Sequence, residues 1–155
     1  MGTFRIRPAT QADAPALLRV RHDAILGISF AGATQDQLRR WAERRDIDWM
    51  VHAMRGRQTW AATVDGEIVS WIAIKNDGLE GLYTDPRHSG CGIGSSLLQF
   101  VEGVLKDRGI ERILVDASIN AESFYRRHGY KTVGPGSSEA ARTMQKAITQ
   151  SGWDT

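Results

Sequence analysis

The chain contains the stretch Asp85-Pro86-Arg87-His88-Ser89-Gly90-Cys91-Gly92-Ile93-Gly94-Ser95-Ser96-Leu97-Leu98, in which three alternating glycines lie between a predicted strand and an amphipathic run. Glycine permits left-handed backbone angles and the close approach of a ligand. A helix that begins here presents unpaired N–H groups and the positive end of its dipole to a phosphate. The stretch therefore predicts a loop that binds a diphosphate-containing cofactor through main-chain donors, with no lysine in the loop.

This loop differs from two other glycine-rich loops. Gly94 is followed by Ser95 and not by Lys and then Ser or Thr, which excludes a Walker A loop. The dinucleotide fingerprint requires a further glycine where Ser95 or Leu97 stands, and it follows the first strand of its fold, whereas this loop lies past mid-chain. A plain glycine-rich turn before a helix remains the alternative.

A second motif, Ala121-Glu122-Ser123-Phe124-Tyr125-Arg126-Arg127-His128-Gly129-Tyr130, follows the apolar run Ile113-Leu114-Val115. Together, the two motifs resemble those of the GNAT superfamily of acetyl-CoA-dependent N-acetyltransferases. Residues 89–94 resemble that family's pyrophosphate loop, Q/R-x-x-G-x-G/A, and the second motif resembles its A-x-x-F-Y-x-x-x-G-F/Y segment. A weaker similarity at residues 4–10 extends the resemblance over roughly residues 3–147.

Two positions depart from the family pattern. The first loop position, usually Gln or Arg, is Ser89, so a long polar contact near the phosphates is missing. The position seven before the tyrosine, often Asn, is Ser118, and the nearby Asn120 is interpreted as a helix N-cap. Neither departure excludes cofactor binding, because backbone groups supply most phosphate contacts in such loops.

The resemblance implies an α/β (α+β) fold with a single N-acetyltransferase domain over residues 1–155, of which 149–155 form a loose tail. It implies a mixed central sheet of about seven strands, flanked by about four helices and splayed between its fourth and fifth strands, here residues 79–84 and 112–117. The cofactor's pantetheine arm enters that gap in the family. Gly81 either forms a bulge that opens the gap or is a plain strand irregularity.

Local patterns predict several element boundaries. Asp65-Gly66, between two alternating apolar runs, predicts a β-hairpin. Thr34 with Gln37 predicts a capping box at a helix start, and Gly109 predicts the end of the helix that begins near Gly92.

Composition narrows the classes of partner. The net charge is only +2, and no basic stripe with interleaved aromatic residues points to nucleic acid. The single cysteine excludes an internal disulfide and a cysteine-built metal site, and the four histidines lack ligand spacing, so we expect no metal. No signal peptide and no apolar run near ~20 residues is visible, which favours a cytoplasmic protein without a membrane partner. The oligomeric state, monomer or homodimer, stays open.

The implied activity is transfer of the acetyl group of acetyl-CoA directly to a primary amine of a small molecule or peptide, in a ternary complex. Tyr125 occupies the position of the family's tyrosine acid, and a phenol with a pKa near 10 is matched to a leaving thiolate. The alternative is a core aromatic residue. Adjacent helix positions point about 100° apart, which predicts that Phe124 packs inward and Tyr125 faces the cleft.

The general base stays open between Glu80, Asp116 and no dedicated carboxylate. By resemblance, the cofactor-binding residues are Leu82, Tyr83, Thr84, Ser89, Gly90, Cys91, Gly92, Ile93, Gly94, Ser95 and Ser118. The Cys91 thiol is either activated by the helix N-terminus or simply small and turned away.

The acceptor pocket is expected to draw on Trp41, Trp49, Phe30 and His22, although aromatic residues at helical spacing are more often core residues. The sequence does not identify the acceptor. A non-catalytic acyl-CoA-binding or sensing domain on the same fold is the alternative function.

Overall fold

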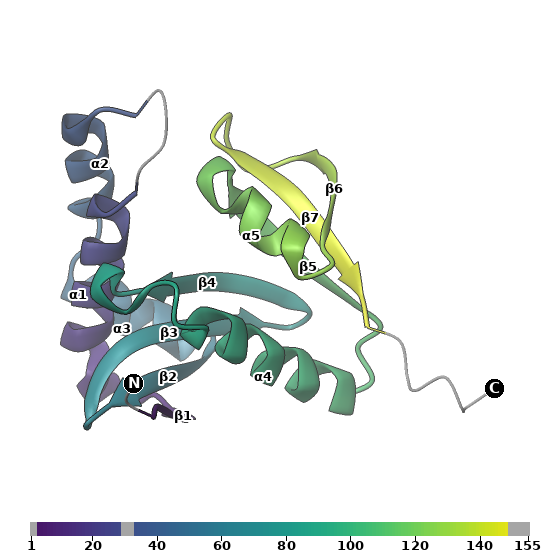
Figure 1. The fold of residues 1–155 in the computed structure, drawn as a ribbon, viewed down its shortest axis with the longest axis horizontal. Helices are drawn as coiled ribbons and strands as arrows, with labels where there is room; N and C mark the ends of the chain where they lie inside the picture. Colours follow the sequence, from purple (N-terminus) through teal and green to yellow (C-terminus); the bar gives the residue numbers. More distant parts are fainter. Residues whose placement is uncertain (1–2, 29–32, 149–155) are drawn as a thin grey trace.

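The computed structural model describes residues 3–28 and 33–148, so the predicted tail at 149–155 lies outside the described residues. Its strands form one mixed seven-stranded sheet in the order β1-β2-β3-β4-β5-β7-β6 (Figure 1). The strands are β1 (Arg5–Pro8), β2 (Gln58–Val64), β3 (Glu67–Lys75), β4 (Gly78–Thr84), β5 (Arg112–Ser118), β6 (Lys131–Pro135) and β7 (Ala141–Ala147).

The described residues form five α-helices, where about four were expected, and three short 3-10 turns. The helices are α1 (Ala14–Leu26), α2 (Gln35–Ala42), α3 (Ile47–Arg55), α4 (Ile93–Asp107) and α5 (Glu122–Arg127), and the turns are η1 (Gln11–Asp13), η2 (Pro86–His88) and η3 (Ile119–Ala121).

The local signals in the sequence are confirmed. Asp65 and Gly66 have φ values of 52° and 81°, the left-handed pair that a two-residue hairpin between β2 and β3 requires. Thr34 Oγ1 accepts from the Gln37 N–H at 3.1 Å, and Gln37 Oε1 accepts from the Thr34 N–H at 2.8 Å, which forms the capping box of α2. Gly109 follows α4 with φ +82°.

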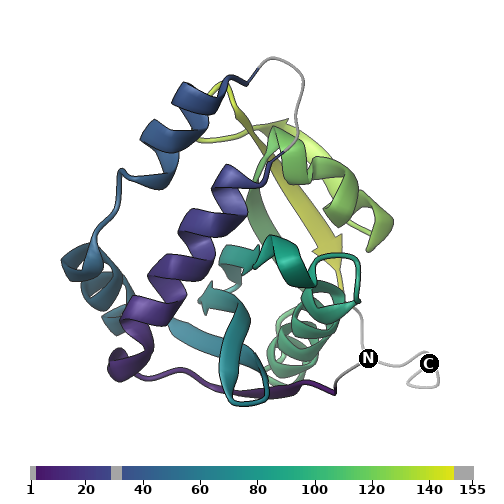
Figure 2. The ribbon, with the colours of Figure 1, turned by 60° about the vertical axis from the view of Figure 1, so that its left-hand side comes forward.

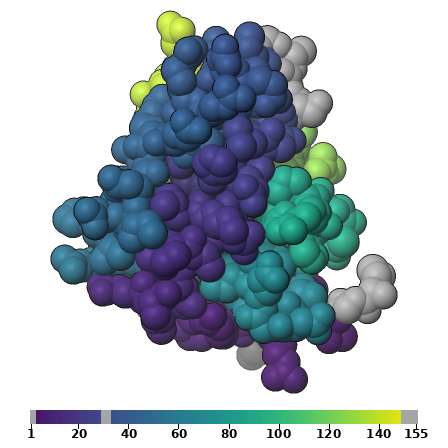
Figure 3. Space-filling view, turned by 90° about the vertical axis from the view of Figure 1, so that its left-hand side faces the viewer, coloured from purple at the N-terminus to yellow at the C-terminus, as the bar shows by residue number. Residues whose placement is uncertain are grey.

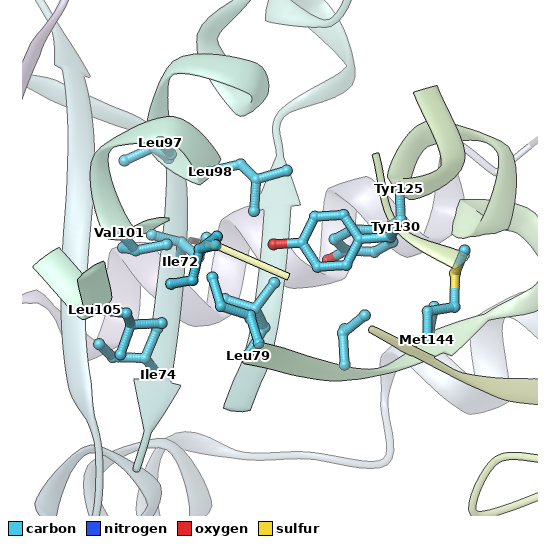
Figure 4. Close-up of a cluster of buried hydrophobic side chains, with 14 of the residues drawn as sticks. Ile72, Ile74, Leu79, Leu97, Leu98, Val101, Leu105, Tyr125, Tyr130 and Met144 are labelled. Carbon is cyan, nitrogen blue, oxygen red and sulfur yellow. The ribbon is translucent and has the colours of Figure 1, made fainter. Parts of the chain in front are cut away.

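Helices cover both faces of the sheet. Successive side chains of β3 point to opposite faces, so each face contributes to a different core. Trp71 and Ala73 pack with α1 and α3, whereas Ile72 and Ile74 pack with α4. α1 and α3 cover the first of these faces, and α2 packs against α1. Figure 3 shows these three helices in purple and blue, and Figure 2 shows α1 crossing the sheet. Figure 4 shows the other core, where Leu97, Leu98, Val101 and Leu105 of α4 meet β3. The core thus holds α4 against the sheet beside β3.

The sheet splays between β4 and β5, as predicted. These two parallel strands pair only at Gly78–Leu114 and Leu79–Val115. On its other side, β4 pairs Leu79 with Ile74 and Gly81 with Ala73, so Glu80 is the extra residue of a β-bulge. Figure 1 shows β5 and β7 diverging from β4. The bulge next to Gly81 therefore lies where pairing between β4 and β5 ends.

Candidate active site

A cavity of about 690 Å³ opens where β4 and β5 part. Its walls come from β4 between Leu79 and Thr84, from the end of β5 with η3, and from α5. The ends of α1 and α2 and the turn between β6 and β7 also line the cavity. The expected pantetheine-pairing residues Leu82, Tyr83 and Thr84 all line this cavity.

The glycine loop adjoins this cavity and presents free backbone donors. Gly90 and Gly92 have φ values of +78° and +83°, and Gly92 is the N-cap residue of α4. Going along the chain from Gly90, Ser96 is the first residue whose backbone N–H donates a hydrogen bond, to Gly92 O at 3.0 Å. Within the described residues, the N–H groups of residues 90–95 have no protein acceptor. A row of unpaired donors at the positive end of a fifteen-residue helix fits a phosphate group.

Gly94 brings the loop against the end of β4. A Cβ atom at Gly94 would lie 3.3 Å from Thr84 Oγ1, so only a residue without a side chain fits easily there. Thr84 Oγ1 is in turn hydrogen-bonded to Ser70 Oγ at 2.8 Å. The third glycine therefore brings the row of free backbone donors next to the cavity.

A buried carboxylate fixes the start of the loop. Asp85 is 1% exposed, and its carboxylate accepts from Arg87 Nη2 at 2.7 Å and from the Arg87 backbone N–H at 3.0 Å. These hydrogen bonds from Arg87 lower the pKa of Asp85 from 3.8 to about 2. Arg19 of α1 adds an ion pair at 3.5 Å. The loop is thus anchored to β4 and α1.

Tyr125 lines the cavity and is only 5% exposed. Its hydroxyl makes no hydrogen bond to any described residue, and burial raises its pKa, which keeps the proton on the oxygen. The neighbouring Phe124 is half-buried and packs edge-to-face on Tyr125 at 5.3 Å. Phe124 packs against the core and Tyr125 lines the cavity, as predicted, but Tyr125 is also the more deeply buried of the two rings.

The two candidate bases both line the cavity but differ in their partners. Glu80, on the bulge, is 38% exposed in its side chain and lies 3.8 Å from Arg57 Nη2. Asp116, on β5, accepts from both the backbone N–H and the hydroxyl of Ser137 in the β6–β7 turn. Asp116 thereby holds that turn in place, whereas Glu80 has one long ion pair and remains partly open.

The structure adds a contact that spacing in the sequence did not reveal. His128 Nδ1 lies 2.8 Å from Phe124 O, and because a carbonyl only accepts, Nδ1 carries the proton. Nε2 lies 2.9 Å from Ser95 Oγ, in the first turn of α4. His128 therefore orients the Ser95 hydroxyl from the end of α5, across thirty-three residues of sequence.

The remaining loop residues fall into two groups. Ser89 donates its hydroxyl to Pro86 O at 2.9 Å and so closes the turn before the loop. Cys91 is exposed, with Sγ 3.8 Å from Ser89 O. Ser118 and Asn120 line the cavity. The interpretation of Asn120 as a helix N-cap is wrong, because Asn120 lies inside η3 and Ala121 is the N-cap residue of α5.

The expected acceptor residues separate in the structure. Trp41 of α2 lines the cavity. Trp49 does not; its ring packs against guanidinium groups. His22 lies outside the cavity beside Asp23, and Phe30 lies outside the described residues. Of these four residues, Trp41 is therefore the one that the described structure places on the cavity wall.

Two other classes of site have no candidate in the described part of the chain. Within residues 3–28 and 33–148, no helix has the length and apolar character to cross a membrane. In the same residues, no three His, Cys, Asp or Glu side chains gather in a way that could hold a metal ion.

Comparison with known proteins identifies the family. The family model of the acetyltransferase (GNAT) domain matches residues 31–146, so the chain belongs to this family of acetyltransferases. A protein named as the uncharacterised N-acetyltransferase YafP of Escherichia coli (strain K12) is 26% identical over 133 residues, which is 86% of this chain and 85% of that protein.

Solved structures show the same fold. A GCN5-related N-acetyltransferase from Rhodopseudomonas palustris superposes with a TM-score of 0.84 at 28% identity, covering 96% of this chain and 98% of that one. The PaiA N-acetyltransferase of Thermoplasma acidophilum, solved in complex with coenzyme A, gives a TM-score of 0.80 at 19% identity, covering 94% and 99%.

Proposed function

We propose that this acetyltransferase uses acetyl-CoA and transfers the acetyl group directly to a primary amine in a ternary complex. One observation carries the proposal: the cavity at the β4–β5 splay meets a row of free backbone donors at one end and contains a tyrosine hydroxyl that has no partner among the described residues. Acetyl-CoA supplies the reactive thioester. The N–H groups of residues 90–95 and the Ser95 hydroxyl hold its diphosphate, and the splayed edge of β4 from Leu82 to Thr84 aligns its pantetheine arm.

Tyr125 is the general acid in this proposal. As the amine nitrogen bonds to the acyl carbon, the carbon–sulfur bond breaks and the Tyr125 hydroxyl gives its proton to the departing thiolate. Its burial keeps that proton in place until thiolate develops. No hydrogen bond to a described residue has to break for this transfer.

The amine must lose a proton to attack. Glu80 is the preferred acceptor of that proton, directly or through water, because it lines the cavity and stays partly exposed. Asp116 is the weaker candidate, because the two donors of Ser137 already occupy its oxygens. An amine that is largely neutral at the working pH needs neither group.

A thiol-release assay tests the proposal. The protein is incubated with acetyl-CoA and panels of polyamines, amino acids, aminoglycosides and short peptides, and free CoA is measured. We expect release with at least one amine, and mass spectrometry should find the acetylated product. Binding of acetyl-CoA without turnover across all panels would instead favour a non-catalytic acyl-CoA-binding domain. Tighter binding of ATP or NAD than of acetyl-CoA would overturn the cofactor assignment.

A further inference from the structure

Arg44, just after α2, brings a positive charge into the acceptor side of the cavity. Its neighbours on that wall are apolar: Ile25 and Ile28 at the end of α1 and Trp41 on α2. Within the described residues, the Arg44 side chain has no ion pair and no hydrogen bond. A guanidinium beside an apolar wall has five donors available for a ligand.

The two acidic residues that line the cavity already have partners. Glu80 lies 3.8 Å from Arg57, and Asp116 takes two hydrogen bonds from Ser137. Neither forms an ion pair with Arg44. Among the described charged side chains of the lining, Arg44 is therefore the one whose charge has no partner.

More arginines stand behind the same wall, around the ring of Trp49 in α3. The guanidinium carbons of Arg21, Arg45 and Arg57 lie 5.7, 4.7 and 5.7 Å from the centre of that ring. Arg21 is only 4% exposed, and its side chain donates a hydrogen bond to Ala42 O at 3.2 Å. Of these three arginines, only Arg57 has a carboxylate of a described residue within ion-pair distance, so the region has an excess of positive charge.

This charge affects an incoming amine in two ways. Nearby guanidinium groups disfavour the ammonium form, so they lower the pKa of the bound amine and favour the neutral nucleophile. They also attract an acidic group, and a guanidinium binds a carboxylate through two parallel hydrogen bonds. An acceptor with both an amine and a carboxylate uses both effects, whereas a polyamine has no acidic group for Arg44 to bind.

We infer that the acceptor is a small amine that also carries a carboxylate, such as an apolar amino acid, with the carboxylate on Arg44 and the apolar part against Ile25, Ile28 and Trp41. The inference rests on the proposed function, and it names the class of acceptor for that same site. Glu80 or water then takes the proton of the amine, and Arg44 acts as a specificity-determining residue.

The test compares leucine, methionine and phenylalanine with their carboxamides and with spermidine. Each carboxamide keeps the amine and the side chain but replaces the carboxylate by a neutral group, and its amine loses a proton more readily. A preference for the acids therefore cannot come from amine basicity. We expect kcat/KM to be at least about tenfold higher for the acids, since hydrogen bonds between charged groups are the stronger class.

Arg44→Gln should lower kcat/KM for the acids by about 10- to 100-fold, mainly through KM, and change that for the carboxamides less than about twofold. Arg44→Lys should fall between, because it keeps the charge but not the planar fork. Arg40→Gln, an equal charge change at an exposed α2 residue outside the cavity lining, is the control and should leave both values unchanged.

Two outcomes overturn the inference and leave the proposed function unaffected. In the first, the carboxamides or spermidine are acetylated as efficiently as the acids. In the second, Arg44→Gln lowers kcat/KM by the same factor for all acceptors. Absence of turnover with every amine tested, with acetyl-CoA bound, overturns the proposed function and this inference with it.

Discussion

Replacement of Gly92 by Asp should abolish the stabilisation of this protein by coenzyme A. Gly92 is the N-cap of α4, with φ +83°, and no atom lies within 4 Å of the point where a Cβ would stand. A side chain therefore fits without collision, but the left-handed backbone costs about 1–2 kcal/mol for a non-glycine residue. The variant should fold with a Tm lower by roughly 2–8 °C. Its carboxylate would then lie among the donors that hold the diphosphate in the proposed function.

The magnitude of the ligand effect follows from linkage. A ligand at about 100 times its Kd stabilises the folded state by about 2.7 kcal/mol, which raises the Tm of a chain of this size by roughly 5–10 °C. Differential scanning fluorimetry with and without acetyl-CoA measures this shift. We expect the wild-type protein to show it and Gly92→Asp to show none at the same concentration.

Gly109 provides a matched control at the other end of α4. It has φ +82° and equally open space, so Gly109→Asp carries the same backbone cost and the same charge without touching the loop. Gly109→Asp should keep the full shift, and Gly92→Ala, which lacks the charge, should keep part of it. Our interpretation of the loop fails if Gly92→Asp retains more than half of the wild-type shift, because the phosphates then lie elsewhere.

Four further outcomes are expected. Tyr125→Phe should lower kcat by about 10²- to 10⁴-fold and change the Kd of acetyl-CoA less than about threefold. If the variant keeps more than half of the wild-type kcat while chemistry is rate-limiting, Tyr125 is a packing residue. Cys91 is exposed beside the free donors, so maleimide labelling should slow when CoA is bound, and equal rates would place the thiol outside the site. Ser95→Ala should weaken CoA binding by about 2- to 10-fold in calorimetry. His128→Phe should weaken it by a similar factor in the wild-type protein but have no further effect in the Ser95→Ala variant, whereas two independent effects would add. The pKa of Asp85 is lowered to about 2, so the stabilisation from its carboxylate is complete above about pH 4 and is lost as the pH falls through 2. Urea titrations should therefore show that the free energy of unfolding falls more steeply in this window for wild type than for Asp85→Asn. Parallel curves would mean that the Arg87 pair adds no stability.

Much of the fold could be predicted because its signals are local. The turn at Asp65-Gly66, the capping box at Thr34 and the glycine after α4 each depend on backbone angles or hydrogen bonds within a few residues, and all three are confirmed. The bulge at Glu80 and Gly81 was also within reach, because a glycine inside an alternating strand breaks its period. Such features depend on the segment itself and not on which other elements pack around it.

The contacts that shape the site were not predictable in the same way. His128 meets Ser95, Asp116 meets Ser137, and Arg57 meets Glu80, over separations of twenty-one to thirty-three residues. These pairs depend on how α5, the β6–β7 turn and the start of β2 are oriented around the splay. Hydrophobic periodicity predicts which face of an element is buried, but it carries no information on the polar side chain opposite.

The bulge on β4 connects these two kinds of feature. An extra residue at Glu80 ends the pairing with β5, so the same backbone irregularity that opens the cavity also places a carboxylate on its wall. That coincidence makes Glu80 the preferred base in the proposed function, but its ion pair with Arg57 links the carboxylate to the arginines around Trp49. The proposed proton acceptor and the proposed acceptor specificity thus share one set of arginines, a link that the positions of Glu80 and Arg57 in the sequence did not reveal.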